Sequence, residues 1–365
     1  KGNAYLTAIL DYGERSMRKA IAELQDGVYA ASDFSDTDCF KPVDIETRVT
    51  ITIKGDDMTV DFTGTSPQIR GFKNSGIANT HSAVYCALSA FLDPSIPKNE
   101  GTYRPIKIIA PLGSVVNARA PAPMTMNTVF PAIDIMNACW GALAQCNPDR
   151  ACAGWGKSVF GISSGNKPEG GVFVLYHWHG SSGGGAVKGR DGFPTSSHQM
   201  TLGGMFIPNV ETYEQSYPMH VHRYEIRTDA GGAGEFRGGP GVDYEVDVLV
   251  GGEHLLRGEG ARKPSGAGVN GGQWGAKGSI TVYDLVTGAE VPSPVYGVEE
   301  VEPFHLVIEA SAGGGWGNPL DRDPHAVLRD VRDGFVSPEA ARDIYGVEIS
   351  ADRKSVASTA ARTAH

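Results

Sequence analysis

Two histidines, His177 and His179, follow a short apolar run, Val172–Tyr176, whose length and content of β-branched and aromatic residues predict a buried strand. Because alternate residues of a strand share a face, we expect both imidazoles to point the same way, and His198 to join them from a neighbouring strand. Two imidazoles from one strand and a third from the next can hold zinc with one position open for water. Isolated histidines are more often ordinary surface or interior residues, so a metal site and a structural role both stay open.

The same segment carries a glycine triplet in the sequence SSGGG at residues 181–185. Glycines let backbone amides approach an anion, which is how phosphate loops work. The segment has neither the lysine of a Walker loop nor the GxGxxG spacing of a dinucleotide-binding turn. The sequence therefore gives little support for a phosphate site here.

The elements that must position this segment are mostly short strands. The chain has 365 residues, of which 41% are apolar, and its 48 glycines and 22 prolines are more than a helical protein carries. Between residues 152 and 300, short strands alternate with glycine turns, which favours an antiparallel or barrel-like sheet over βαβ units. We therefore predict an α+β fold of mainly antiparallel or barrel-like sheets with a few packed helices.

Ahead of these strands, the sequence predicts helices and a hairpin. Apolar residues recur at helical spacing over residues 3–24 and 74–92, and they place His81 on the buried face of the second helix. A histidine in that position is more often a core residue hydrogen-bonded to backbone than a ligand. Apolar and polar residues alternate around a Gly-Asp-Asp turn over residues 49–62, which predicts a β-hairpin.

A further helix is predicted over residues 131–145. Asn127 and Thr128 stand just before it. Because the N-terminus of a helix can receive an anion, both residues are candidate ligand contacts.

We predict three parts along the chain: a helix- and hairpin-containing part over residues 1–150, a glycine-rich β domain carrying the pocket over residues 151–310, and a helical tail over residues 311–365. In the tail, residues 324–332 and 338–344 predict two short helices, and Ser337 caps the second.

Charge and composition exclude several classes of partner. The net charge is −10, and no long cluster of lysine and arginine occurs, which argues against nucleic acid or an anionic membrane as the partner. No apolar run approaches the ~20 residues that cross a bilayer. The five cysteines form no CxxC pair, so we expect reduced thiols and a cytoplasmic protein. The chain begins with Lys1 and shows no signal peptide, so we expect a processed or incomplete chain.

Three stretches together resemble the hydantoinase B/oxoprolinase family. They are DFTGTSPQIRGFKNSGIANTHSAVYCALSAFLDPSIPKNEGTYRPIKIIAP at residues 61–111, YPMHVHRYEIRTDAGGAGEFRGGPG at residues 217–241 and GGGWGNPLDRDPHAVLRDVRDGFVSPEAARDIYGV at residues 313–347. The last stretch follows a long pattern that is specific to the end of that family. The resemblance covers nearly the whole chain.

The resemblance implies a subunit that works with a hydantoinase A-like partner, and ATP with Mg²⁺ would be bound mainly by that partner. Members of the family either open cyclic amides, as 5-oxoprolinase, N-methylhydantoinase and caprolactamase do, or carboxylate ketones such as acetone and acetophenone. In both branches, ATP is thought to phosphorylate a carbonyl, enol or bicarbonate oxygen. The substrate implied is therefore a small ketone, with bicarbonate, or a cyclic amide.

The chain departs from the family in two informative ways. The family elements NDPxxGGxHxxD and HxxD, which carry its metal ligands, do not occur here, so a divalent metal such as Zn²⁺ or Mn²⁺ would be held by residues outside this chain. The segment PNVETYE at residues 208–214 is similar to the carboxylase branch, and MTMNTVFPAI at residues 124–133 replaces a hydrolase block. A ketone carboxylase needs a dry pocket rather than a positioned water, and it is our first prediction.

The resemblance also suggests roles for individual residues. As catalytic residues we predict four that would stabilise developing charge or transfer protons: His177, His179, His198 and Glu211. As substrate contacts we predict Asn74, Asn127, Thr128 and Glu214. Glu214 is as readily a structurally paired carboxylate. The alternatives to a carboxylase are an ATP-dependent cyclic amide hydrolase and a noncatalytic scaffold subunit of such a complex.

Overall fold

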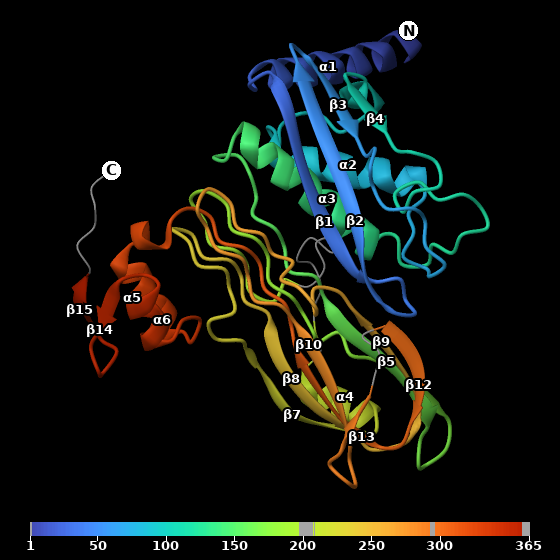
Figure 1. Cartoon of the computed structure of the whole chain (residues 1–365), viewed down its shortest axis with the longest axis vertical. Coiled ribbons are helices and arrows are strands. Elements are labelled where there is room, and N and C mark those ends of the chain that lie inside the picture. Colours follow the sequence, from blue (N-terminus) through green and yellow to red (C-terminus); the bar gives the residue numbers. More distant parts are fainter. Residues whose placement is uncertain (1, 197–206, 208, 293–295, 360–365) are drawn as a thin grey trace. The chain divides into compact units, whose positions relative to one another are not determined.

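The structure is a computed structural model that describes residues 2–196, 207, 209–292 and 296–359 (Figure 1). The chain forms two compact units. Residues 1–35 and 44–152 make the first unit, and residues 36–43 and 153–365 make the second. The predicted tail, residues 311–365, clusters with the second unit.

The first unit is built on a four-stranded sheet with the strand order β1-β2-β3-β4. Its elements are α1 (Gly2–Ala22), β1 (Gly27–Thr37), β2 (Pro42–Lys54), β3 (Asp57–Asp61), α2 (Ile77–Phe91), η1 (Glu100–Tyr103), β4 (Ile106–Ile109) and α3 (Phe130–Cys146). β2 and β3 form the predicted antiparallel hairpin, in which Ile51 lies opposite Val60. One side-chain face of this hairpin is fully buried, as its alternating apolar pattern requires.

Helices α2 and α3 pack against each other in the first unit. Small residues such as Ala83 and Ala87 on the buried face of α2 let α3 come close, and the indole of Trp140 on α3 donates a 3.0 Å hydrogen bond to the carbonyl of Ala87. The prediction that His81 lies on the buried face was wrong. His81 lies half-buried at the edge of the buried stripe, with its ring edge-on to Tyr85. The buried stripe comprises Thr80, Ala83, Val84, Ala87, Leu88 and Phe91.

The second unit contains two antiparallel sheets. One has the order β12-β9-β5-β6 and the other the order β11-β10-β13-β8-β7. The strands are β5 (Val159–Asn166), β6 (Val172–Tyr176), β7 (Met219–Ile226), β8 (Val242–Val248), β9 (Gly252–Gly258), β10 (Ser279–Asp284), β11 (Glu290–Val291), β12 (Tyr296–Val301) and β13 (Phe304–Glu309). Inward-facing residues of both sheets form one apolar core. The predicted α+β fold of mainly antiparallel sheets is confirmed, and the described strands form open sheets rather than a closed barrel.

Glycine-rich segments without strand structure run side by side in the second unit (Figure 1). Backbone hydrogen bonds connect each segment to the next. The amide of Gly239 donates to the carbonyl of Gly184 at 2.8 Å, and the amide of Gly313 donates to the carbonyl of Gly239 at 2.9 Å. The segments lie so close that a Cβ on Gly183 would be 1.7 Å from the carbonyl oxygen of Gly239. The glycine triplet therefore serves backbone packing, and its amides are used within the protein.

The C-terminal part of the second unit is a small helical element closed by a two-stranded sheet. It comprises η3 (Pro319–Asp321), α5 (Pro324–Arg332), α6 (Pro338–Asp343), β14 (Val347–Ile349) and β15 (Val356–Thr359). The predicted cap is confirmed, since the Ser337 hydroxyl accepts a hydrogen bond from the amide of Ala340 at 3.0 Å. The buried guanidinium of Arg322 contacts both Asp330 and Asp191, each at 2.7 Å, and so joins α5 to the glycine-rich segments.

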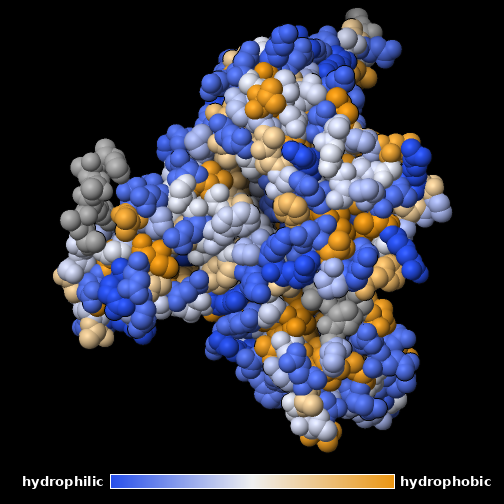
Figure 2. All heavy atoms as spheres, viewed as in Figure 1, coloured by the Kyte–Doolittle hydropathy of each residue, from blue (hydrophilic) through white to orange (hydrophobic). Residues whose placement is uncertain are grey.

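Hydrophilic side chains predominate on the face of the molecule drawn in Figure 2, with smaller apolar patches between them. Among the helices of the described residues, none is long and apolar enough to cross a membrane. All five cysteines are free thiols.

Candidate functional site

The candidate site of the second unit begins at the end of β6. β6 pairs with β5, and the amide of His177 continues this ladder by donating to the carbonyl of Gly161 at 2.9 Å. Phe173 and Leu175 face the core, and His177 and His179 extend the same alternation, so both imidazoles point inward as predicted. The prediction of a buried strand holds for one face of β6 only, because β6 is an edge strand whose other face meets solvent.

A chain of polar side chains starts from His177 and crosses the sheet. The Ser163 hydroxyl lies 2.8 Å from His177 Nε2 and 2.8 Å from His254 Nδ1, and the Tyr244 hydroxyl lies 3.3 Å from His177 Nδ1. Ser163 and His254 are cross-strand partners on β5 and β9. Gly161 leaves room for the rings, since a Cβ there would be 2.9 Å from His254 Cε1.

This polar chain can be ordered in two directions. When Tyr244 donates to His177, the imidazole donates to Ser163 and the hydroxyl donates to His254. When His254 donates to Ser163, the order reverses and His177 donates to Tyr244. In either order His254 Nε2 stands at the end, and it is buried with no hydrogen-bond partner among the described residues. The chain therefore has the hydrogen-bond pattern of a proton relay.

His179 lies in a cage of three tyrosines. Its ring is stacked on Tyr244 with centroids 4.8 Å apart and meets Tyr213 and Tyr224 edge-on at 4.9 and 5.0 Å. Both ring nitrogens are buried and have no hydrogen-bond partner within the part of the chain that the structure describes. This imidazole therefore has hydrogen-bonding capacity that the described fold does not use. An unsatisfied buried polar group costs about 1–3 kcal/mol of stability.

Burial keeps these histidines neutral. It lowers the pKa of His179 to about 4 and that of His254 to about 4. The pKa of His177 lies well below its ordinary value, because burial and the neighbouring His254 and His179 all oppose its protonation. At neutral pH the three rings can exchange protons or form hydrogen bonds, but they carry no positive charge. Such neutral rings can stabilise an anion by hydrogen bonding but not by positive charge.

The remaining candidates of this segment lie near helix α4 (Val210–Ser216). Glu211 is exposed in the first turn of the helix. Glu214 accepts a hydrogen bond from the amide of Val221 at 2.8 Å and lies 3.0 Å from His220 Nδ1, so it is structurally paired. The helix thus places Tyr213 against His179. His198 lies outside the described residues, and the catalytic roles of His198 and Glu211 stay predictions.

The other predicted substrate contacts belong to the first unit. Asn74 is fully buried, and its amide group bonds to backbone atoms of Ile69, Gly71 and Pro123 at 2.8–3.0 Å. Asn127 precedes α3, and its carbonyl accepts a hydrogen bond from the Asn79 side chain at 2.9 Å, whereas Thr128 is exposed. The roles of Asn74, Asn127 and Thr128 as substrate contacts stay predictions.

Sequence analysis missed Ser163, His254 and the three tyrosines of the site. Ser163 and His254 are 91 residues apart in the chain and meet only because β5 and β9 are neighbours. Alternation of apolar and polar residues within a strand does not reveal which strands pair. The strand order was the missing information.

A family model for hydantoinase B/oxoprolinase matches residues 2–319. The B component of a putative D-/L-hydantoinase of Pseudomonas sp. (strain NS671) is 35% identical over 94% of this chain and 59% of its own length. The β subunit of the caprolactamase of Pseudomonas jessenii is 32% identical over 99% of this chain and 64% of its own length. The chain thus spans about 60% of the length of these curated relatives.

Two solved structures share the fold. The crystal structure of the ATP-dependent caprolactamase from Pseudomonas jessenii superposes with a TM-score of 0.81 at 32% identity, and it covers 96% of this chain and 62% of that one. A nucleotide-free structure of acetone carboxylase gives a TM-score of 0.78 at 20% identity over 95% of this chain and 53% of that one.

Proposed function

Because the chain belongs to the hydantoinase B/oxoprolinase family, we propose that it supplies part of the B-type component of an ATP-dependent enzyme that opens a cyclic amide. The observation that carries this proposal is the identity of 35% and 32% to components of a hydantoinase and a caprolactamase over more than nine-tenths of the chain. Sequence motifs alone ranked a ketone carboxylase first. At 20% identity, the acetone carboxylase structure supports a common fold and not that reaction.

The proposed enzyme needs a second kind of chain. The two relatives are named as the B component of a hydantoinase and the β subunit of a caprolactamase, which supports a partner chain in each case. We assign ATP with Mg²⁺ to a hydantoinase A-like partner. Phosphorylation of the amide oxygen there would activate the amide carbon for attack by water. Loss of the ring nitrogen would then open the ring and leave an acyl phosphate, which a second water would hydrolyse to carboxylate and phosphate.

Within this chain, we assign the ring-opening site to His179. A neutral imidazole with both nitrogens unpartnered among the described residues can take a proton from the attacking water and then pass it to the departing ring nitrogen. The three tyrosines exclude bulk water, which strengthens hydrogen bonds in the site. The polar chain through His177 and Ser163 shares Tyr244 with this cage and would hold that tyrosine in position.

Access to His179 would require that Tyr213 moves. Its helix, α4, has seven residues, none of which is fully buried. Displacement of α4 would uncover one edge of the imidazole while Tyr244 and Tyr224 stay on the sheet. We therefore place substrate entry on the α4 side of the cage.

An ADP-release assay of the complete complex tests the proposed reaction. Lactams and hydantoins are compared with small ketones, each with and without bicarbonate. The proposal expects ADP release with a cyclic amide and no dependence on bicarbonate. ADP release that requires both a ketone and bicarbonate would overturn it.

The carboxylase is the second candidate, and one observation favours it. Residues 210–214 of the segment similar to the carboxylase branch lie in α4, and Tyr213 touches His179. The residues that resemble the carboxylases therefore lie at the candidate site itself. Bicarbonate-dependent ADP release in the same assay would support this candidate. If substitutions of His179 left the activity of the complex unchanged, that result would support a scaffold role for this chain.

A further inference from the structure

Three neighbouring strands of the five-stranded sheet align polar residues on the face that points away from the core. Asp247 on β8 lies directly opposite His305 on β13 and opposite His220 on β7. The adjacent residues Val246 and Leu306 are fully buried, so Asp247 and His305 point to the solvent side. His305 Nδ1 donates to Asp247 Oδ1 at 2.7 Å.

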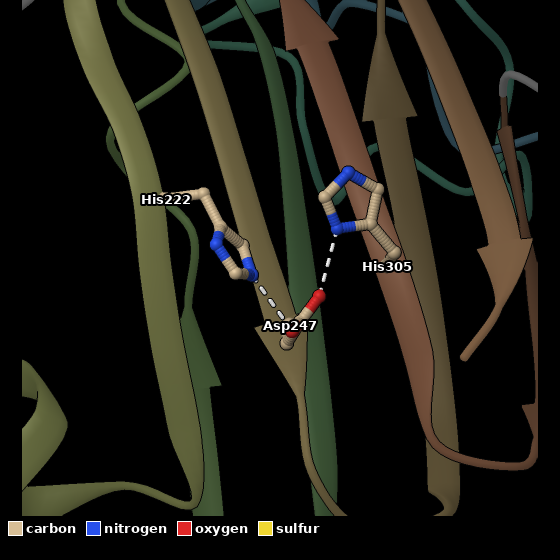
Figure 3. A group of neighbouring side chains, drawn as sticks. All are labelled: His222, Asp247 and His305. Atoms are coloured by element: carbon tan, nitrogen blue, oxygen red, sulfur yellow. Dashed lines mark hydrogen bonds and ion pairs between the residues drawn. The ribbon is translucent and has the colours of Figure 1, made fainter. Parts of the chain in front are cut away.

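An irregularity in β7 adds a second histidine. The pairing register with β8 shifts between Val221 and Arg223, so His222 is the extra residue of a β-bulge. Bulges turn side chains away from their regular direction. His222 Nε2 consequently reaches Asp247 Oδ2 at 2.7 Å (Figure 3). His220 instead lies 3.0 Å from Glu214.

We propose that His222, Asp247 and His305 form a binding site for a divalent first-row transition metal of the Zn²⁺ class. Each residue offers one ligand atom, and these atoms lie within 4.8 Å of one another. Figure 3 shows both imidazoles turned toward the carboxylate that lies between them. Ligand atoms at about 2.0–2.2 Å from a metal stand somewhat closer together than this, so small side-chain rotations complete the site.

The donor set determines the kind of metal. Two imidazole nitrogens and one carboxylate suit Zn²⁺ and Co²⁺, whereas Mg²⁺ and Ca²⁺ prefer oxygen ligands alone. The site is open on one side, because the side chains of His222 and His305 are 40% and 26% exposed. One or more coordination positions are therefore left for water or for a group from another molecule.

The carboxylate holds both rings in place before a metal arrives. Its hydrogen bonds fix the nitrogens His222 Nε2 and His305 Nδ1 toward a common point. A bound metal takes the place of the proton on each of these nitrogens, and in a neutral ring that proton moves to the other ring nitrogen. The site lies on the opposite face of the sheet from His179, whose partner Tyr244 points into the core, and it is independent of the proposed ring-opening reaction.

Titration of the untagged 365-residue chain with metal tests the site. The protein is first stripped with a chelator, and Co²⁺ is then added while the visible absorption is recorded. Isothermal titration with Zn²⁺ gives the affinity. We expect a saturable Co²⁺ spectrum of one equivalent that Zn²⁺ displaces. The absence of a Co²⁺ spectrum and of Zn²⁺ binding would overturn the proposal.

Variants locate the binding. Asp247→Asn and His305→Gln each remove one ligand and should weaken Zn²⁺ binding at least tenfold, because ligand changes act directly on metal affinity. His220→Gln is the matched control on the same sheet face, and it should bind as the unchanged protein does. Far-ultraviolet circular dichroism verifies that each variant is folded. Unchanged binding in both ligand variants, or an equal loss in His220→Gln, would contradict the site.

Discussion

The ring of His179 is stacked on the ring of Tyr244, with an angle of 12° between their planes, where the two sheets of the second unit meet. Tyr244 comes from β8 and His179 from the turn after β6, so the contact joins one sheet to the segment that leaves the other. The hydroxyl of the same tyrosine lies 3.3 Å from His177. Tyr244 thus connects the cage of His179 with the polar chain through Ser163.

The buried histidines should make the protein sensitive to acid. His179 and His254 have a folded-state pKa of about 4 against an ordinary value of 6.5, so the unfolded chain takes up protons first as the pH falls. The free energy of unfolding should therefore decrease between pH 6.5 and pH 4, by up to on the order of 3 kcal/mol for each of these histidines. Denaturant unfolding at a series of pH values measures this decrease.

A variant identifies the source of the acid sensitivity. His179→Phe keeps an aromatic ring in the cage and cannot be protonated, so its stability should fall less between pH 6.5 and pH 4. The control His325→Gln changes an exposed histidine on α5 and should leave the pH dependence as it was. Equal pH dependence in all three proteins would refute the assignment of a neutral His179.

The close packing of the glycine-rich segments leads to a second prediction, on the stability of a glycine variant. Gly183→Ala would place a methyl group 1.7 Å from the carbonyl oxygen of Gly239, so backbone segments must separate. We expect a loss of about 3 kcal/mol or more in the free energy of unfolding. Gly76→Ala is the control, because its Cβ would meet only the Met124 sulfur at 3.5 Å. Urea unfolding compares the two, and similar stabilities would argue against tight backbone packing.

The ion pairs of Arg322 make a third prediction. Asp330→Ala leaves the buried guanidiniums of Arg322 and Arg237 without this carboxylate, and removal of one buried partner costs about 3–5 kcal/mol. Asp343→Ala breaks an exposed pair with Arg342, and it should change stability by less than about 1 kcal/mol. Thermal unfolding of the two variants provides the comparison. Equal effects would show that the buried network contributes no more than a surface pair.

Much of the local structure could be predicted from sequence because it depends on local pattern. The alternation after β6 correctly put His177 and His179 on one face, and α3 begins and ends within one residue of the predicted helix. The Ser337 cap followed from a residue type at a helix start. These features need no knowledge of distant residues.

The rest depends on contacts between distant parts of the chain. Gly183 contacts Gly239, and Ser163 contacts His254. No local sequence pattern around these residues predicts either contact. The bulge at His222 arises from the pairing of β7 with β8 and turns that side chain toward Asp247. His81 was misplaced because helical periodicity alone did not show which stripe α3 would cover.

The most direct test of the account is the turnover number of the complete complex with His179→Gln. If His179 transfers a proton in ring opening, kcat for a cyclic amide should fall by about a hundredfold or more, while ATP binding and the assembly of the complex are unchanged. His325→Gln should retain full activity. A His179→Gln complex with unchanged kcat would contradict the central claim.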